Sequence, residues 1–181
     1  MSTGTPDILD SLAPYFSNSI TVNDEEMIDE LFAVFQRDFF DSPFEINGKK
    51  VKVKFYPYTK HNRDGLPAFY SNYYEKFVHL ITREVKGRTV VMPKQRVFKE
   101  ERANRIHWLK PILQHWKDPR ITFFTFIEAD GTARDYFWYK AKSYMVIMEE
   151  VTPDYVLITG FCVDKKEENY YDLKYRFRRS P

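Results

Sequence analysis

His79 and Arg83 are four residues apart in a stretch rich in tyrosine and phenylalanine. In an α-helix this spacing places both side chains on the same face. A histidine titrates near neutral pH and can give or take a proton, and an arginine can hold a phosphate through two hydrogen bonds. The pair therefore indicates a site that acts on a phosphate group. A histidine in an aromatic helix is also common at the edge of a core, so a structural role stays open.

A second group of candidate residues lies in the basic segment from Arg102 to Leu113, which reads Arg-Ala-Asn-Arg-Ile-His-Trp-Leu-Lys-Pro-Ile-Leu. Guanidinium and ammonium groups bind phosphates, and aromatic rings stack on bases. We expect this segment to contact nucleic acid through Arg102, Arg105, His107, Trp108 and Lys110. Surface arginines and a core tryptophan are the structural alternative.

A third candidate is a strand with one basic face. Asn47 and Gly48 predict a tight turn, after which Val51, Val53 and Phe55 alternate with lysines. Successive side chains of a strand point to opposite faces, so one face carries only Lys50, Lys52 and Lys54. We expect that face to bind phosphates.

The charge of the chain is divided unevenly. Its net charge is +2, but residues 1–45 hold ten acids and one base, a charge of −9, which leaves +11 on residues 46–181. We expect residues 1–45 to form an acidic tail and amphipathic helix, and residues 46–181 to form one basic α+β domain. A strongly basic body attracts polyanions, RNA above all. Residues 23–41 are candidates for masking the basic face, as is a separate inhibitory protein; two ordinary solvated surfaces are the plainer alternative.

Several classes of protein do not fit the sequence. The N-terminus lacks a basic region followed by an apolar one, and no apolar run could span a bilayer, so we expect a cytoplasmic protein with no membrane partner. The single Cys162 excludes an internal disulfide, and the four histidines show no metal-ligand spacing. No phosphate-binding or dinucleotide-binding glycine motif is present. We therefore expect neither a metal nor a cofactor.

The elements that must position these residues follow from hydrophobic periodicity. We predict helices over 23–40, with Asn23 as the N-cap, over 69–85, and over 99–116, the last kinked or split at Pro111. Four apolar runs with strand periodicity then follow, at 120–128, 133–140, 143–151 and 155–163. Residues 167–181 form a charged tail. The predicted fold is α+β, with N-terminal helices packed on an antiparallel meander of about four strands.

Four segments together resemble a known family. They are the Arg102–Leu113 segment, Tyr136-Phe-Trp138, Tyr144-Met-Val-Ile-Met-Glu149 and Tyr155-Val-Leu-Ile-Thr-Gly-Phe-Cys-Val163. They look like phage-associated members of the barnase–EndoU–colicin E5/D–RelE-like (BECR) nuclease superfamily, over about half of the chain. The resemblance implies helices packed on a four-stranded antiparallel sheet and metal-independent ribonuclease activity, in some members toxin-like. It implies catalytic roles for His79, Arg83, Arg105 and Thr159. The chain departs from the family pattern at Gly160 and Phe161.

Three functions are consistent with these observations. The first is a metal-independent endoribonuclease that cleaves RNA by general acid/base chemistry. The second is a non-catalytic module of the same fold that binds nucleic acid or a protein. The third is an interaction protein that uses its aromatic surface, whose association would be insensitive to salt.

Overall fold

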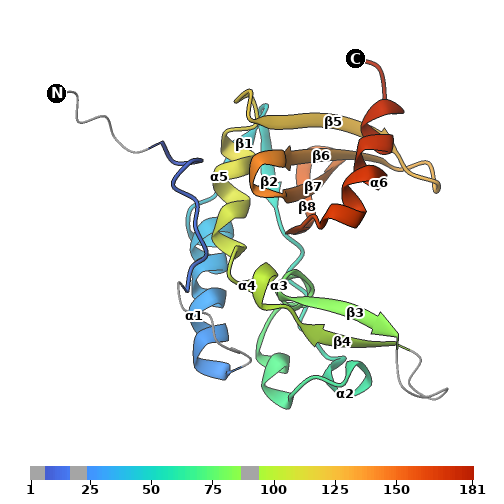
Figure 1. Ribbon diagram of the computed structural model, residues 1–181. Coiled ribbons are helices and arrows are strands. Elements are labelled where there is room, and N and C mark those ends of the chain that lie inside the picture. The colour runs from blue at the N-terminus through green and yellow to red at the C-terminus, as the bar shows by residue number, and fades with distance from the viewer. Residues whose placement is uncertain (1–6, 17–23, 87–93) are drawn as a thin grey trace.

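The computed structural model describes residues 7–16, 24–86 and 94–181. Its largest element is a six-stranded sheet in the order β1-β2-β8-β7-β6-β5 (Figure 1). The strands are β1 Glu45–Ile46, β2 Lys49–Lys52, β5 Ile121–Ile127, β6 Ala133–Tyr139, β7 Tyr144–Val151 and β8 Asp154–Cys162. A separate hairpin pairs β3 Thr82–Lys86 with β4 Lys94–Phe98. The helices are α1 Glu25–Gln36, α2 His61–Asp64, α3 Glu75–Ile81, α4 Glu100–Ala103, α5 Leu109–Gln114 and α6 Lys165–Arg176.

The α+β class is confirmed, but the four-stranded meander is wrong as a description of the sheet. The four predicted runs form β5 to β8, and each pairs antiparallel with the next. The sheet continues beyond them, because β2 pairs parallel to β8 and β1 pairs antiparallel to β2. The sheet is therefore mixed and has six strands. A parallel neighbour that lies about a hundred residues away leaves no local signal in the sequence.

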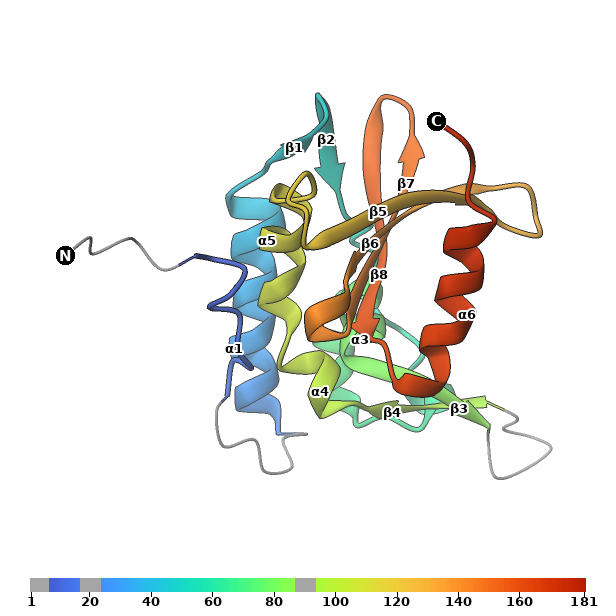
Figure 2. The same ribbon diagram turned by 45° about the horizontal axis from the view of Figure 1, so that its top comes forward.

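The two faces of the sheet are covered by different helices (Figure 2). The main core lies between one face and α1, α3 and α5, where Phe35, Phe77 and Leu109 are fully buried. A smaller core lies under α6, where Tyr171 and Tyr175 pack against Phe124 and neighbouring side chains. α6 replaces the predicted tail; its N-cap Asp164 forms a capping box with Glu167.

The acidic helix α1 is part of the main core. Its apolar stripe, Ile28, Leu31, Val34 and Phe35, is buried, and its acids face outward. Asp24 caps the helix by accepting a hydrogen bond from the Met27 N–H at 3.3 Å, while the predicted cap Asn23 lies outside the described residues. The helix ends in a π-helical turn, Arg37–Asp41. Residues 1–45 thus supply both the acidic charge and one wall of the core.

The predicted helix over 69–85 is wrong at both ends. Residues Ala68–Asn72 form a 3-10 turn, α3 covers only Glu75–Ile81, and the chain turns into β3 at Thr82. The buried Thr82 hydroxyl donates to the Val78 carbonyl at 2.6 Å, which occupies a carbonyl at the helix end. From Thr82 onward the backbone pairs with β4 instead. His79 and Arg83 therefore do not share a helical face.

The predicted helix over 99–116 is divided at Asn104 and Arg105 rather than at Pro111. The carbonyl of Asn104 accepts the Tyr15 N–H at 2.8 Å, and its side chain accepts the Phe16 N–H at 3.2 Å. A 3-10 turn, Ile106–Trp108, then leads into α5. Pro111 is the third residue of α5, where a missing N–H costs no hydrogen bond.

The predicted turn is confirmed, whereas the lysine strand is confirmed only as far as Lys52, where β2 ends. Asn47 and Gly48 have φ of 51° and 75°, the left-handed values that this tight turn requires. Lys50, Lys52 and Lys54 are exposed, while Val51 and Val53 are buried. Within the described ranges, no helix has the length and apolar character needed to cross a membrane.

Candidate nucleic-acid interface

The predicted site residues lie in three places. Arg102 joins β3 to Thr159 and Gly160 of β8, while Arg83 lies on β3 and His79 on the adjoining α3. We call this region, where the β3–β4 hairpin meets β8, the hairpin base. Lys50, Lys52 and Lys54 form the lysine strand. His107 and Trp108 contact the N-terminal segment, residues 7–16, while Arg105 lies over the Trp108 ring and Lys110 contacts Ser42. Arg105, predicted as catalytic, thus lies away from the hairpin base, over the Trp108 ring. Arg102, predicted to bind nucleic acid, lies within it.

His79 is held in a cationic environment. Its Nε2 lies 3.8 Å from Oε1 of Glu75 one turn earlier on α3, and 37% of its side chain is exposed. Burial, with the Arg96 guanidinium as the next contribution, lowers the pKa of His79 to about 4. The imidazole is therefore neutral at pH 7 and can accept a proton.

Two further cations lie at the hairpin base, Arg96 and Lys76. Neither was predicted from the sequence as a site residue. Arg96 on β4 donates from Nε to the Thr82 hydroxyl at 2.8 Å. Lys76 on α3 donates to the Ile158 carbonyl at 2.5 Å, and burial together with Lys54 lowers the pKa of Lys76. Lys76 lies three residues before His79, a helical spacing from which it could have been predicted. The strand pairing of Arg96 left no such signal.

A β-bulge makes the contact of Lys76 possible. Leu157 and Thr159 of β8 pair with adjacent residues of β7, so Ile158 has no partner in that register. Its carbonyl is then available to Lys76. Bulges of this kind free a backbone group from the sheet and are frequent beside functional sites.

Arg102 links the hairpin to β8. Its Nη1 donates to the Thr82 carbonyl at 2.8 Å and its Nη2 to the Gly160 carbonyl at 3.2 Å. The Thr159 hydroxyl lies 3.4 Å from Nη2, at the limit of a hydrogen bond. Arg83 is more open: 58% of its side chain is exposed, and its nearest carboxylate, Glu167, lies 3.8 Å away. Arg102 is thus fixed in place, whereas Arg83 is free to move toward a ligand.

Two exposed aromatic residues adjoin the lysine strand. Phe55 is 65% exposed and Tyr56 is 67% exposed. They line, with Lys52, Lys54 and Val156, a pocket of about 480 Å³. The alternation with lysines predicts Phe55 on the apolar face of the strand, but β2 ends at Lys52 and the following residues leave the sheet. Large exposed rings between lysines can stack on bases while the lysines bind phosphates.

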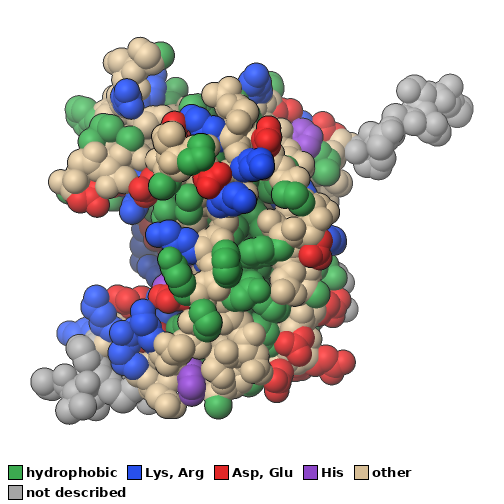
Figure 3. All heavy atoms as spheres, turned by 180° about the vertical axis from the view of Figure 1, so that it is seen from behind, with side chains coloured by type: hydrophobic (Ala, Val, Ile, Leu, Met, Phe, Trp, Pro, Cys, Tyr) green, Lys and Arg blue, Asp and Glu red, His purple; other side chains and the backbone are tan. Residues whose placement is uncertain are grey.

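The lysine strand and the hairpin base are connected. Lys54 is close enough to Lys76 to affect its pKa, and Lys52 pairs with Val156 two residues before Ile158. Seen from behind, the molecule is hollowed between the part that carries α6 and the part that carries the β3–β4 hairpin, and Lys and Arg side chains gather over the hairpin (Figure 3). Basic side chains therefore lie both along the lysine strand and over the hairpin, with acidic and apolar side chains among them.

The side chains of His107 and Trp108 contact the N-terminal segment, residues 7–16. The indole N–H of Trp108 donates to the Ala13 carbonyl at 3.0 Å, and Nε2 of His107 lies 2.8 Å from the same oxygen. Trp108 is only 3% exposed, so its ring is not available to stack on a base. Arg105 lies over the Trp108 ring, and Lys110 donates to the Ser42 carbonyl at 2.7 Å. These four side chains have structural partners.

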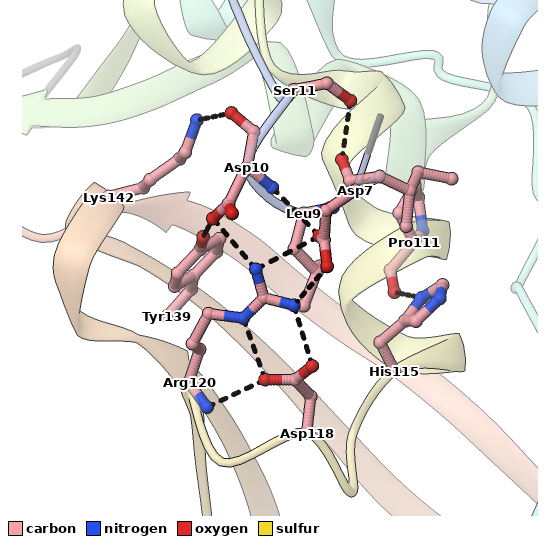
Figure 4. Close-up of polar contacts among 11 residues, drawn as sticks. Asp7, Leu9, Asp10, Ser11, Pro111, His115, Asp118, Arg120, Tyr139 and Lys142 are labelled. Atoms are coloured by element: carbon pink, nitrogen blue, oxygen red, sulfur yellow. Dashed lines mark hydrogen bonds and ion pairs between the residues drawn. The ribbon is translucent and has the colours of Figure 1, made fainter. Parts of the chain in front are cut away.

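Arg120 anchors the same segment (Figure 4). Its guanidinium contacts Asp7 at 2.9 Å, Asp10 at 2.8 Å and Asp118 at 2.8 Å. The Arg120 guanidinium holds the pKa of Asp118 well below its usual range and also lowers the pKa of Asp7. Leu9, between the two N-terminal acids, is fully buried. Electrostatic and apolar contacts together dock residues 7–16.

We expect Arg120→Ala to loosen this segment, because both of its acids lose their cation. Limited proteolysis should then cut within residues 7–16 several times faster than in the unaltered chain, and added salt should narrow the difference. Lys117→Ala is the matched control, since Lys117 is an exposed cation nearby whose ammonium lies over the Trp116 ring. Equal cleavage rates for both variants would show that the remaining contacts, among them buried Leu9 and the hydrogen bond from Trp108 to the Ala13 carbonyl, hold the segment without Arg120.

The acids of α1 are directed away from the basic surface. Asp29 accepts a hydrogen bond from Tyr73 and Glu30 from Tyr15, while Asp38 pairs with its neighbour Arg37. In the described parts of the chain, no acidic side chain of α1 reaches ion-pair distance from a base of residues 46–181. α1 and the hairpin lie on opposite sides of the molecule (Figures 1 and 2). In this arrangement residues 24–41 leave the hairpin base uncovered.

Among the described residues, no three His, Cys, Asp or Glu side chains are grouped so that they could hold a metal ion. Comparison with known proteins gave no match to a family model, to a curated protein or to a solved structure.

Proposed function

We propose that the protein binds single-stranded RNA along the surface that joins the lysine strand to the hairpin base. The observation that carries the proposal is the pairing of two exposed rings, Phe55 and Tyr56, with Lys52 and Lys54 around one pocket. Bases stack on the rings and the lysines neutralise the phosphates. Stacking contributes about 1–3 kcal/mol per base, and only unpaired bases expose their faces for it. The resemblance to BECR nucleases favours RNA over DNA.

Metal-independent RNA cleavage is the second candidate function, favoured by the neutral His79 among cations. His79 would take the proton of a 2′-hydroxyl, whose oxygen attacks the phosphorus and forms a 2′,3′-cyclic phosphate. The 5′ oxygen would leave with a proton from the Lys76 ammonium. Arg96 would stabilise the negative charge that develops on the phosphorus-bound oxygens. Arg83, Arg102 and Thr159 would hold the neighbouring phosphate.

The test of cleavage uses the full chain and mixed cellular RNA in EDTA, with products resolved on a denaturing gel. We expect discrete fragments with cyclic phosphate ends and their loss in His79→Ala, while RNA binding stays nearly unchanged. His115→Ala is the control, because His115 contacts the Pro111 carbonyl far from the hairpin base. Intact RNA with the unaltered protein would exclude cleavage and leave RNA binding as the function.

The pH profile gives an independent check on His79. A base with a pKa of about 4 stays neutral down to that pH. Cleavage should therefore be nearly constant between about pH 7 and pH 5 and fall only as pH approaches 4, whereas an ordinary histidine would lose activity near pH 6.5. A decline centred near 6.5 would assign the base to another group.

A further inference from the structure

A small pocket lies at the inner end of the hairpin base. It has a volume of about 200 Å³ and is surrounded by four segments of the chain: β3, the start of α4, the end of β8 and the first turns of α6. Three cations line it: Arg83, Lys99 and Arg102. Phe161 and Tyr171, with ring centroids 5.6 Å apart, form an aromatic part of its lining.

The positive charge at this pocket is poorly compensated. Arg102 uses its terminal nitrogens on backbone carbonyls, and its buried Nε has no hydrogen-bond partner. Within the part of the chain that the structure describes, no carboxylate lies within ion-pair distance of Arg102 or Lys99. Arg83 meets Glu167 only at 3.8 Å. Glu101 and Glu167 also line the pocket, so it carries one positive charge in excess. Burying a guanidinium without a counter-charge costs stability, and a bound anion would offset that cost.

The surroundings of the pocket suit the end of a strand rather than its middle. An internal phosphodiester needs room for the chain to enter and to leave. Here Phe161, Cys162 and Tyr171 line the pocket from the side of β8 and α6, while the cations lie on β3 and the start of α4. A terminal phosphate needs less room, and the pocket volume of about 200 Å³ is small.

We propose that this pocket binds a phosphate monoester at the end of an RNA strand, an inference that rests on the proposed RNA binding. A monoester carries about −1.5 to −2 charges at pH 7 and three acceptor oxygens, against one charge for a diester. The guanidinium of Arg83 is exposed and 3.8 Å from its nearest carboxylate, so it can donate two hydrogen bonds to the monoester, and Lys99 adds a point charge. Arg102 supplies a fixed positive potential behind them.

The experiment compares the affinity of the full chain for one short oligouridylate with a 5′-phosphate, with a 3′-phosphate, or with hydroxyls at both ends. Uridine monophosphate is the fourth probe and separates a strand end from a free nucleotide. We expect at least one phosphorylated end to bind on the order of tenfold more tightly than the hydroxyl-ended strand. EDTA and a His79→Ala background prevent cleavage during the measurement.

Two variants assign the preference to the pocket. Lys99→Ala should reduce the advantage of the phosphorylated end while leaving the hydroxyl-ended strand within about twofold. Arg83→Ala should also reduce that advantage, and it should weaken the hydroxyl-ended strand as well, because Arg83 is proposed to hold a neighbouring phosphate. Arg176→Ala is the control, because Arg176 is an exposed arginine at the other end of α6 and loses the same charge. Preference that persists in both pocket variants would overturn the assignment.

The remaining outcomes separate this inference from RNA binding itself. Equal affinity for all three strands would overturn the phosphate pocket and leave RNA binding intact. Binding of uridine monophosphate without binding of any strand would support the pocket and overturn the RNA proposal. Failure of all four probes to bind would overturn both.

Discussion

Lys52→Glu combined with Lys54→Glu is expected to weaken RNA binding on the order of a hundredfold at low salt, because two contacts to phosphates become repulsive. Both side chains are exposed and line the pocket beside Phe55 and Tyr56, so their replacement leaves the core unchanged. The salt dependence should change as well. The slope of log K against log salt is negative, and loss of two phosphate contacts to a single strand should make it less steep by roughly 1.4.

The matched control reverses two charges elsewhere, with Lys117→Glu and Arg176→Glu. Both residues are exposed and neither lines the proposed interface. A similar loss of affinity in this control would mean that net charge, rather than a defined surface, drives binding. Binding that resists salt in the unaltered protein would favour an aromatic protein-interaction surface instead. Filter binding or fluorescence anisotropy at several salt concentrations distinguishes these results.

Phe55→Ala tests the aromatic component separately. Removing one stacking platform should cost about 1–3 kcal/mol of binding and leave the salt slope unchanged. In the same salt titration, the lysine variant should therefore change the dependence of affinity on salt, whereas the phenylalanine variant should change the affinity alone.

Phe35→Ala is expected to reduce the free energy of unfolding by about 3–5 kcal/mol, the usual cost of deleting a buried phenylalanine side chain. Phe35 is fully buried, and its ring lies 5.6 Å from that of Phe77 on α3 and 5.3 Å from that of Phe39. Such a loss is a large fraction of the stability of a domain of this size. Urea unfolding followed by tryptophan fluorescence measures it.

Because α1 is part of the core, deletion of the acidic segment does not test its charges alone. Removing residues 1–45 would take away the buried stripe of α1 along with its charges, so loss of function in a truncated chain would report unfolding. Glu26→Lys changes an exposed charge of α1 without touching the core, and we expect a stability within about 0.5 kcal/mol of the unaltered protein. A Phe35→Ala variant as stable as the unaltered chain would instead make α1 a detachable appendage.

The same Glu26→Lys variant tests self-masking. If α1 masks the basic surface, RNA affinity should rise when its charge is reversed. The arrangement of α1 away from the hairpin predicts little change.

Local patterns in the sequence were sufficient for the elements whose partners are close in the chain. β5 to β8 alternate and turn as the sequence predicts, because consecutive antiparallel strands are specified by short-range periodicity and turn residues. The Asn47-Gly48 turn and the exposed lysine face follow for the same reason. Uneven charge was also plain in the sequence.

The candidate site depended on contacts between distant segments. Helical periodicity favoured one helix through His79 and Arg83. From Thr82 onward, however, the backbone forms strand hydrogen bonds with β4 instead of continuing the helix. That pairing brought Arg96 to the hairpin base and separated Arg83 from His79. Parallel pairing of β2 with β8 likewise brought the lysine strand beside Val156. Short-range patterns were enough to predict the α+β class, the antiparallel pairing of β5 to β8 and the distribution of charge. Which cations meet depended on tertiary contacts, because hydrogen bonds between distant strands outweigh local helix preference and leave no periodic trace in either segment.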